Sequence, residues 1–265
     1  IHAVLLAFTA SALFPIFLVI NNSFKDRRAI FRDPYALPNS ESWDLVGYET
    51  VFQGANFGLY FMNSLTVTIV SLLLILACSA MAAFALSEYR FRGNALLGLY
   101  MAVGIMIPIR LGTVSIIRLM VDLGLNDTLW ALILVYTATG IPLAVFILSV
   151  FLRNVPGELK DAARIDGASE YRVFWMILPL VRPALGTVAV FNMIPVWNDL
   201  WFPLVLASSE QSKTVILGAQ VFLGQYVNDW NAVLASLSLA MVPVIILYVI
   251  FSRQLVSGLM RGAHR

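Results

Sequence analysis

Charged residues are scarce in this chain of 265 residues. Only 12% of the residues are charged, whereas 60% are hydrophobic, and the mean hydropathy is +0.85. Such a composition is too apolar for a soluble globular domain and predicts a membrane protein. The small net charge of +2 without a concentrated basic patch argues against nucleic-acid binding. The single cysteine, Cys78, excludes an intrachain disulfide.

Residue types that carry covalent chemistry or bind ATP are also few. The two histidines, His2 and His264, stand at opposite ends, so neither a His-assisted serine site nor a metal site is predicted. Lysine occurs only at positions 25, 160 and 213, and none follows a glycine, so the Gly-Lys-Ser/Thr phosphate loop of an ATPase is missing. We expect a chain that is not an enzyme and that holds no cofactor or metal of its own.

Long apolar runs recur along the chain, and about 20 such residues cross a bilayer as a helix. We predict an all-α fold, a polytopic membrane helical bundle that forms one transmembrane domain over residues 1–265. The six predicted spans lie at about 3–22, 60–87, 95–119, 128–152, 177–207 and 231–253. A signal peptide is the alternative for the first run, but the run from Ala3 to Phe24 is longer than a signal-peptide core.

Charges interrupt the third predicted span, at Arg110 and Arg118, and the fifth, at Asp199. A charge within a span normally faces a bundle interior or water, so these two spans are predicted to line a cavity. One interior carboxylate is too few for the proton relays of many secondary transporters.

The distribution of Lys and Arg between loops predicts the orientation. An even number of spans places both termini on one side, and basic residues concentrate in cytoplasmic loops. With cytoplasmic termini, the nine inner residues are Arg90, Arg92, Arg153, Lys160, Arg164, Arg172, Arg253, Arg261 and Arg265. The five outer residues are Lys25, Arg27, Arg28, Arg32 and Lys213. Four of these five follow the first span and locally favour the opposite orientation, but the total favours cytoplasmic termini.

A charged loop, residues 153–176, separates the fourth and fifth spans. Pro156 suits a helix start, and Glu158 and Asp161 complement the helix dipole in the first turns. Gly167 permits a left-handed turn into a second short helix. Residues 155–175, which we call the elbow, are therefore predicted to form a compact helix-turn-helix.

The first helix of the elbow is predicted to have a small, partly apolar face. Its members are Ala162, Ala163, Ile165 and Ala168. Such a face can press into a groove of another protein. An ordinary surface loop with helical character is the alternative that the residues alone leave open.

The elbow resembles the signature loop of permease subunits of ABC importers. That loop contains Glu-Ala-Ala, then Gly, and later Ile and Leu-Pro; here the equivalents are Asp161-Ala162-Ala163, Gly167, Ile177 and Leu178-Pro179. The first position is Asp instead of Glu, and the residue that usually separates Ile from Leu-Pro is absent. The resemblance implies a role in coupling to an ATPase for Glu158, Asp161, Ala162, Ala163, Asp166, Gly167 and Ala168.

The fifth predicted span carries polar and aromatic residues in sequence: Asn192, Trp197, Asn198 and Asp199. Amides and carboxylates can bond sugar hydroxyls while Trp stacks on the ring, which suits a carbohydrate path. The same residues also suit helix packing, and Asp199 can pair with Arg110. The segment from Trp197 to Leu204 resembles the corresponding segment of maltose-type carbohydrate importers.

The end of the chain resembles the second permease of sugar importers through the run from Arg253 to Gly258 and through Gly262-Ala263. In that family the tail can touch the ATPase, but this chain closes with His264-Arg265. The outer loop from Lys213 through Gln225 to Asp229-Trp230 is one that, in the same subfamily, can reach toward the external binding protein.

Taken as a whole, the resemblance implies the type I ABC importer permease fold in a bacterial cytoplasmic (inner) membrane. The chain would form half of a translocation path for a mono- or oligosaccharide. Implied partners are a second homologous permease, an ATPase dimer that carries ATP and Mg²⁺, and an extracytoplasmic solute-binding protein. The alternatives are the same architecture for an amino acid, peptide or phosphate ester, a proton-coupled carrier, and an intramembrane enzyme.

Overall fold

The computed structural model describes residues 2–54, 56–223 and 228–263, and within these ranges the chain is built of helices without a named strand. This confirms the all-α prediction. Residues 224–227 of the loop that was expected to reach a binding protein, and the closing His264-Arg265, lie outside the described residues. The chain divides into two compact units, residues 1–65 with 199–245 and residues 66–198 with 246–265.

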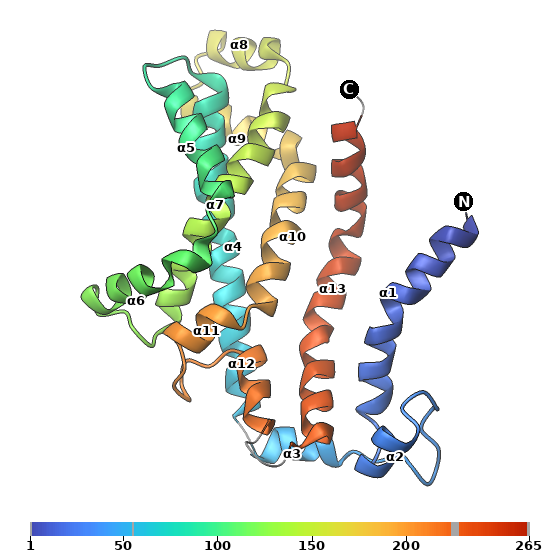
Figure 1. Cartoon of the computed structure of the whole chain (residues 1–265). Helices are drawn as coiled ribbons and strands as arrows, with labels where there is room; N and C mark the ends of the chain where they lie inside the picture. The colour runs from blue at the N-terminus through green and yellow to red at the C-terminus, as the bar shows by residue number, and fades with distance from the viewer. Residues whose placement is uncertain (1, 55, 224–227, 264–265) are drawn as a thin grey trace. The chain divides into compact units, whose positions relative to one another are not determined.

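The first unit consists mostly of elements from the two ends of the chain (Figure 1). They are α1 (His2–Asn22), α2 (Arg27–Arg32), α3 (Val46–Gly54), the start of α4 (Phe57–Glu88), α11 (Trp201–Leu206), α12 (Val215–Ala219), the 3-10 turn η3 (Gln220–Phe222) and the first part of α13 (Trp230–Ala263). Asn231 of α13 donates a 2.7 Å hydrogen bond to the carbonyl of Lys25. This bond joins residues 206 positions apart.

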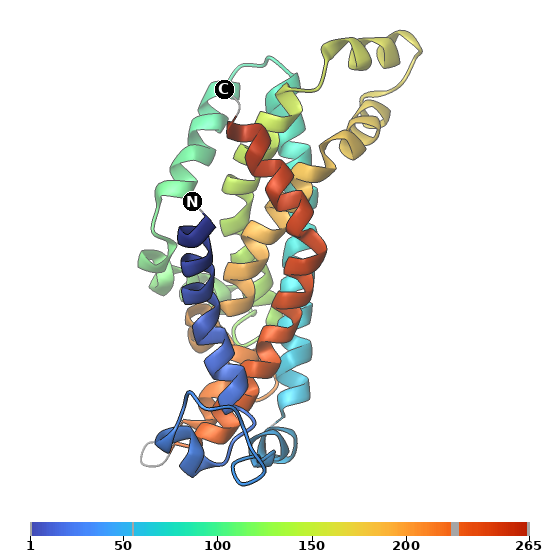
Figure 2. The same cartoon turned by 90° about the vertical axis from the view of Figure 1, so that its right-hand side faces the viewer.

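A buried lysine organises the loop that follows α1, which Figure 2 shows folded beside the end of that helix. Lys25 is only 1% exposed, and its Nζ donates to the carbonyls of Asp33, at 3.0 Å, and Pro34, at 3.4 Å. Asn22 Nδ2 donates to the same Pro34 carbonyl at 3.0 Å. Burial lowers the pKa of Lys25, and the charge of Asp33 partly opposes that shift.

The loop between α11 and α12 is held against the first turns of α4. Asn63 Nδ2 donates to the carbonyls of Gln211 and Lys213, at 2.8 and 2.9 Å, and Ser64 Oγ accepts from the amide of Val215 at 2.8 Å. Buried polar side chains of α4 thereby form hydrogen bonds with main-chain groups of the loop. The loop is a fixed part of the first unit.

The second unit contains the rest of α4 and the elements that follow it. They are α5 (Asn94–Met106), the 3-10 turn η1 (Ile109–Gly112), α6 (Thr113–Asp122), α7 (Leu129–Arg153), α8 (Gly157–Ile165), α9 (Glu170–Ile177), the 3-10 turn η2 (Leu178–Val181) and α10 (Arg182–Asn198). A β-carbon added to Gly140 of α7 would lie 2.5 Å from both Ile75 Cδ1 of α4 and Asn192 Oδ1 of α10. Glycine at this position therefore allows α4, α7 and α10 to approach one another closely.

The third predicted span, 95–119, is broken instead of continuous. Helix α5 ends at Met106, and the pair formed by residues 94–106 and 109–122 is bent by 88°. Pro108 explains the break, because a residue before proline is pushed out of the helical region, and Ile107 has φ −74° and ψ 122°. Proline chemistry thus overrides the apolar run.

The fifth predicted span, 177–207, also has other bounds in the structure. Its helical path begins earlier, at Glu170, and α10 ends at Asn198, before the separate short helix α11. Asp199 contributes to this end because its carboxylate accepts from the amides of Trp201 at 3.3 Å and Phe202 at 3.0 Å, which are the first amides of α11.

Four helices of the described residues are long and apolar enough to cross a membrane, and the bent pair would make a fifth. The four are His2–Asn22, Phe57–Glu88, Leu129–Arg153 and Glu170–Asn198. The apolar part of α13, Trp230–Ile246, is shorter. A multi-span membrane protein is confirmed, whereas the number of six remains a prediction.

Candidate functional site

The elbow has the predicted helix-turn-helix form. Its first helix, α8, ends in paired main-chain bonds: the Ala168 amide donates to the Ala163 carbonyl at 2.9 Å, and the Gly167 amide to the Arg164 carbonyl at 3.0 Å. Gly167 has φ +78°, the left-handed conformation that this type of helix end requires. The turn therefore depends on glycine for its backbone conformation.

The coupling residues that the sequence predicted fall on two sides of the elbow. Ala163 and Ala168 are half-buried and pack against the core of the second unit. The other five, Glu158, Asp161, Ala162, Asp166 and Gly167, are exposed. The predicted small-residue face is thus divided, with two of its alanines directed into the protein instead of outward.

The outward side of the elbow also carries large apolar side chains. Ile165, at the end of α8, is 86% exposed, and Tyr171 of α9 is 83% exposed. Both lie in short helices that project beyond the ends of the longer helices of the same unit (Figure 2). Exposed apolar side chains next to carboxylates are typical of a protein interaction surface.

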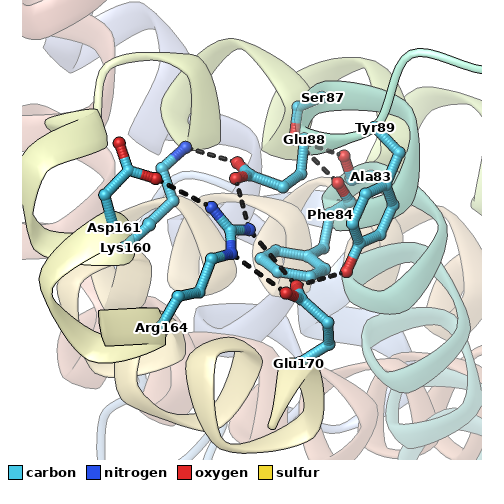
Figure 3. A network of polar contacts seen from close by, with 9 residues as sticks. All are labelled: Ala83, Phe84, Ser87, Glu88, Tyr89, Lys160, Asp161, Arg164 and Glu170. Atoms are coloured by element: carbon cyan, nitrogen blue, oxygen red, sulfur yellow. Dashed lines mark hydrogen bonds and ion pairs between the residues drawn. The ribbon is translucent and has the colours of Figure 1, made fainter. Parts of the chain in front are cut away.

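Arg164 braces the two helices of the elbow against each other (Figure 3). Its Nε donates to Glu170 of α9 at 2.9 Å, and its Nη1 donates to Asp161 one turn away at 3.1 Å. The hydrogen bond to Glu170, followed by one to Glu88, raises the pKa of the guanidinium. The charge of Arg164 is therefore permanent, and the carboxylates around it remain engaged.

Glu88, the last residue of α4, and Tyr89, the residue after it, belong to the same cluster, and neither was predicted from the sequence (Figure 3). Glu88 binds Lys160 through Oε2 and Arg164 Nη2 through Oε1, the latter at 2.7 Å. The Tyr89 hydroxyl donates to Glu170 at 2.6 Å. Burial, and then the bond to Glu170, raise the pKa of Tyr89 to about 12, so its hydroxyl stays a donor at neutral pH.

The predicted path residues on α10 differ in their exposure. Asn192 is 7% and Trp197 3% exposed, and Asn192 Nδ2 donates to the Val188 carbonyl one turn earlier, at 2.9 Å. Asn198 is exposed, and its Nδ2 donates to the Ile194 carbonyl at 3.0 Å. With 3.6 residues per turn, Asn192 and Asn198 lie about 120° apart around the helix. The structure therefore does not bring them to one face.

Asp199, the fourth predicted path residue, lies in the other compact unit and is half-buried. Each of its carboxylate oxygens accepts a hydrogen bond from a main-chain amide at the start of α11. Its predicted pairing with Arg110 stays a prediction, as do the roles of all four residues in a path.

A family model matches residues 75–261, which include the elbow and most of the second unit. The family is described as the inner membrane component of binding-protein-dependent transport systems. This chain belongs to that family. The permease is therefore a subunit of a transport system.

Curated relatives of the permease match along nearly its whole length. It is 31% identical to the diacetylchitobiose uptake system permease protein of Streptomyces coelicolor over 100% of this chain and 88% of the relative. It is 34% identical to the arabinooligosaccharides transport system permease protein of Halalkalibacterium halodurans, over 95% and 90% of the two chains. A third relative, 32% identical, is the probable starch degradation products transport system permease protein of Thermoanaerobacterium thermosulfurigenes, with 94% and 90% covered.

The fold of the permease is that of a solved importer subunit. A chain from the crystal structure of a bacterial ABC transporter involved in the import of the acidic polysaccharide alginate superposes with a TM-score of 0.82. The match covers 95% of the permease and 94% of that chain at 24% identity. The prediction of an ABC importer permease fold is confirmed by this likeness.

Proposed function

We propose that this permease forms half of the translocation path of an ATP-driven sugar importer and couples that path to a separate ATPase through the elbow. The chain itself carries out no covalent chemistry. A second homologous permease would complete the path, ATP and Mg²⁺ would bind to an ATPase dimer, and an extracytoplasmic solute-binding protein would deliver the sugar. The bacterial cytoplasmic membrane would hold the complex, with both termini and the elbow on the cytoplasmic side.

The observation that carries the coupling role is the projecting elbow itself. Its turn is fixed by the left-handed Gly167, its two helices are braced by Arg164, and its outer side exposes Ile165 and Tyr171. A rigid, apolar protrusion is what a groove on another protein can bind without a large loss of conformational entropy. Because its turn and its two helices are held by these contacts, it would also transmit a displacement.

The identity of the cargo as a sugar is supported by the relatives. Diacetylchitobiose, arabino-oligosaccharides and starch degradation products all appear in their names, and all are neutral oligosaccharides. Asn198, an exposed amide near the end of α10, suits a hydrogen bond to a sugar hydroxyl. Asn192 and Trp197 are buried and support the position of α10 among its neighbours in this conformation.

The test is the ATPase activity of the purified complex in lipid. The permease is expressed with its partner permease, ATPase and binding protein, and a panel of mono- and oligosaccharides is added, including diacetylchitobiose, arabino-oligosaccharides and malto-oligosaccharides. We expect one class of sugar to stimulate hydrolysis, and only when the binding protein is present. Glutamine and glycerol 3-phosphate serve as controls for the other solute classes.

Each component of the proposal fails in a distinct way. Stimulation by an amino acid or a phosphate ester would contradict the sugar and retain the importer. A permease that co-purifies with no ATPase would contradict the role of the elbow. Uptake of sugar into vesicles that contain the permease alone, driven by a proton gradient, would replace the proposal by a secondary carrier.

A further inference from the structure

A cluster of ion pairs joins the elbow to the end of α4. Glu88, the last residue of α4, binds Lys160 and Arg164 of α8, and these partners lie 72 and 76 positions later in the chain. The side chains of Glu88 and Lys160 are only 11% and 14% exposed. A carboxylate that is mostly removed from water and bound by two cations is costly to separate from them.

The contacts on the α9 side are independent of Glu88. Tyr89 donates to Glu170 at 2.6 Å, and the rings of Phe84 and Phe174 meet edge to face with centroids 5.4 Å apart. One end of α4 thus holds α8 by charge and α9 by an aromatic contact and a hydrogen bond. Because Arg164 also binds Glu170, the three helices form a closed set of contacts.

The turn after α4 is fixed as well. Asn94 Nδ2 donates to the carbonyls of Leu86, at 3.1 Å, and Tyr89, at 2.8 Å, so the side chain satisfies main-chain acceptors that the helix end leaves open. A fixed helix end is a firm attachment for a neighbouring element. The end of α4 therefore meets the elbow as an ordered surface.

We infer that Glu88 is a positioning residue that fastens the elbow to α4 through Lys160 and Arg164, so that the elbow and the end of α4 move as one body when the ATPase changes state. This inference rests on the proposed coupling function and adds to it the helix that receives the motion. Without Glu88, the elbow would keep its own fold, because Gly167 and the bond from Arg164 to Glu170 remain. Its α8 part would, however, lose the ion pairs to α4 and shift relative to that helix, while α9 stays attached through Tyr89 and Phe84.

The experiment measures the distance between the elbow and the end of α4 by double electron–electron resonance between two nitroxide labels. The labels are attached to cysteines at Arg92, just beyond α4, and at Ser169, between α8 and α9, both of which are exposed, in a chain with Cys78→Ser. The full complex in lipid is measured without nucleotide and with ATP plus EDTA, which allows ATP binding without hydrolysis. With Glu88 intact, we expect one narrow distance distribution that is the same in both states.

In the Glu88→Gln variant, the distribution is expected to broaden, and its mean is expected to shift between the two states. Glu41→Gln, which removes an exposed carboxylate of the first loop, is the matched control and should change neither. Lys160→Met and the double variant complete a double-mutant cycle, in which the broadening of the double variant should be smaller than the sum of the single effects.

A distance that changes with ATP in the chain with intact Glu88 would overturn the inference, and so would a narrow distribution in the Glu88→Gln variant. The amount of ATPase that co-purifies is measured on the same samples. Loss of the ATPase with intact Glu88 would contradict the proposed function instead. In that case, the width of the distance distribution without nucleotide, compared between Glu88→Gln and the control, still decides whether Glu88 fastens the elbow.

Discussion

At the scale of single residues, the elbow depends on the backbone freedom of Gly167 and not on the space around it. A β-carbon added at this position meets no described atom within 4 Å. The constraint is the φ of +78°, which L-residues other than Asn and Asp rarely adopt. A substitution here therefore tests conformation without creating a clash.

We expect Gly167→Ala to weaken coupling, because the left-handed conformation costs alanine about 1–2 kcal/mol. Since 1.4 kcal/mol is about a tenfold change in an equilibrium, sugar-stimulated ATPase activity should fall by about fivefold to thirtyfold. Gly167→Asn, which tolerates this conformation, should retain most of the activity. The measurement is stimulated hydrolysis per mole of complex in lipid.

Gly157→Ala is the matched control, because Gly157 begins α8 with no positive φ and with open space around it. Its activity should equal that of the unmodified chain. Equal activity of the Ala and Asn variants at position 167 would show that the turn does not limit coupling.

At the scale of elements, the loop between α11 and α12 is held by one carboxylate as well as by amides. Glu210 binds Lys213 within the loop and accepts from the Tyr60 hydroxyl of α4. The bond to Lys213, and then the one to Tyr60, lower the pKa of Glu210. Because the pKa of this carboxylate is lowered in the folded protein, its protonation weakens the attachment of the loop to α4.

The attachment should therefore be complete above pH 4.5, the ordinary value of the glutamate, and should be lost as the pH falls through the lower pKa of the folded loop. Hydrogen exchange of the Val215 amide, which donates to Ser64, reports the attachment. After correction for the intrinsic rate, we expect exchange to accelerate only below pH 4.5.

Glu210→Gln should already exchange quickly at pH 7 and should show no acid step. Glu41→Gln, in a different loop, should behave like the unmodified chain. A Val215 amide that exchanges at the same corrected rate at all pH values would contradict this role of Glu210.

The sequence predicted the elements that depend on local chemistry. Pro156 precedes α8, Gly167 ends it, and α7 matches its predicted span of 128–152 closely. The break at Ile107-Pro108 was missed because the apolar run outweighed the proline rule, although the residues that cause it are adjacent in sequence. Glu88 could not be recognised, since its partners lie 72 and 76 positions away.

At the scale of the whole molecule, the topology follows from the position of the loops relative to the membrane. The first loop and the elbow are separated by three predicted spans, so the two should lie on opposite sides. Cysteines introduced at Glu41 and Glu158, both exposed, in the Cys78→Ser chain report their side through a membrane-impermeant maleimide.

We expect the cysteine at Glu41 to react in intact spheroplasts and the cysteine at Glu158 to react only after permeabilisation. This outcome follows from the excess of Lys and Arg in the predicted inner loops. The reverse pattern would favour the opposite orientation, which the four basic residues after the first span predict. Labelling of both sites from outside would mean that the number of spans between them is even.

The buried Lys25 has a consequence for how this protein can diverge. Lys25 and Asn22 bind the main-chain carbonyls of the first loop, and carbonyls are present whatever side chain a residue carries. Of the two residues whose carbonyls are bound, Pro34 can therefore change under mutation while the loop retains its path, whereas the carboxylate of Asp33 also acts on the charge of Lys25. Selection is free to remodel the surface of this loop for new contacts, provided that the two anchors are kept.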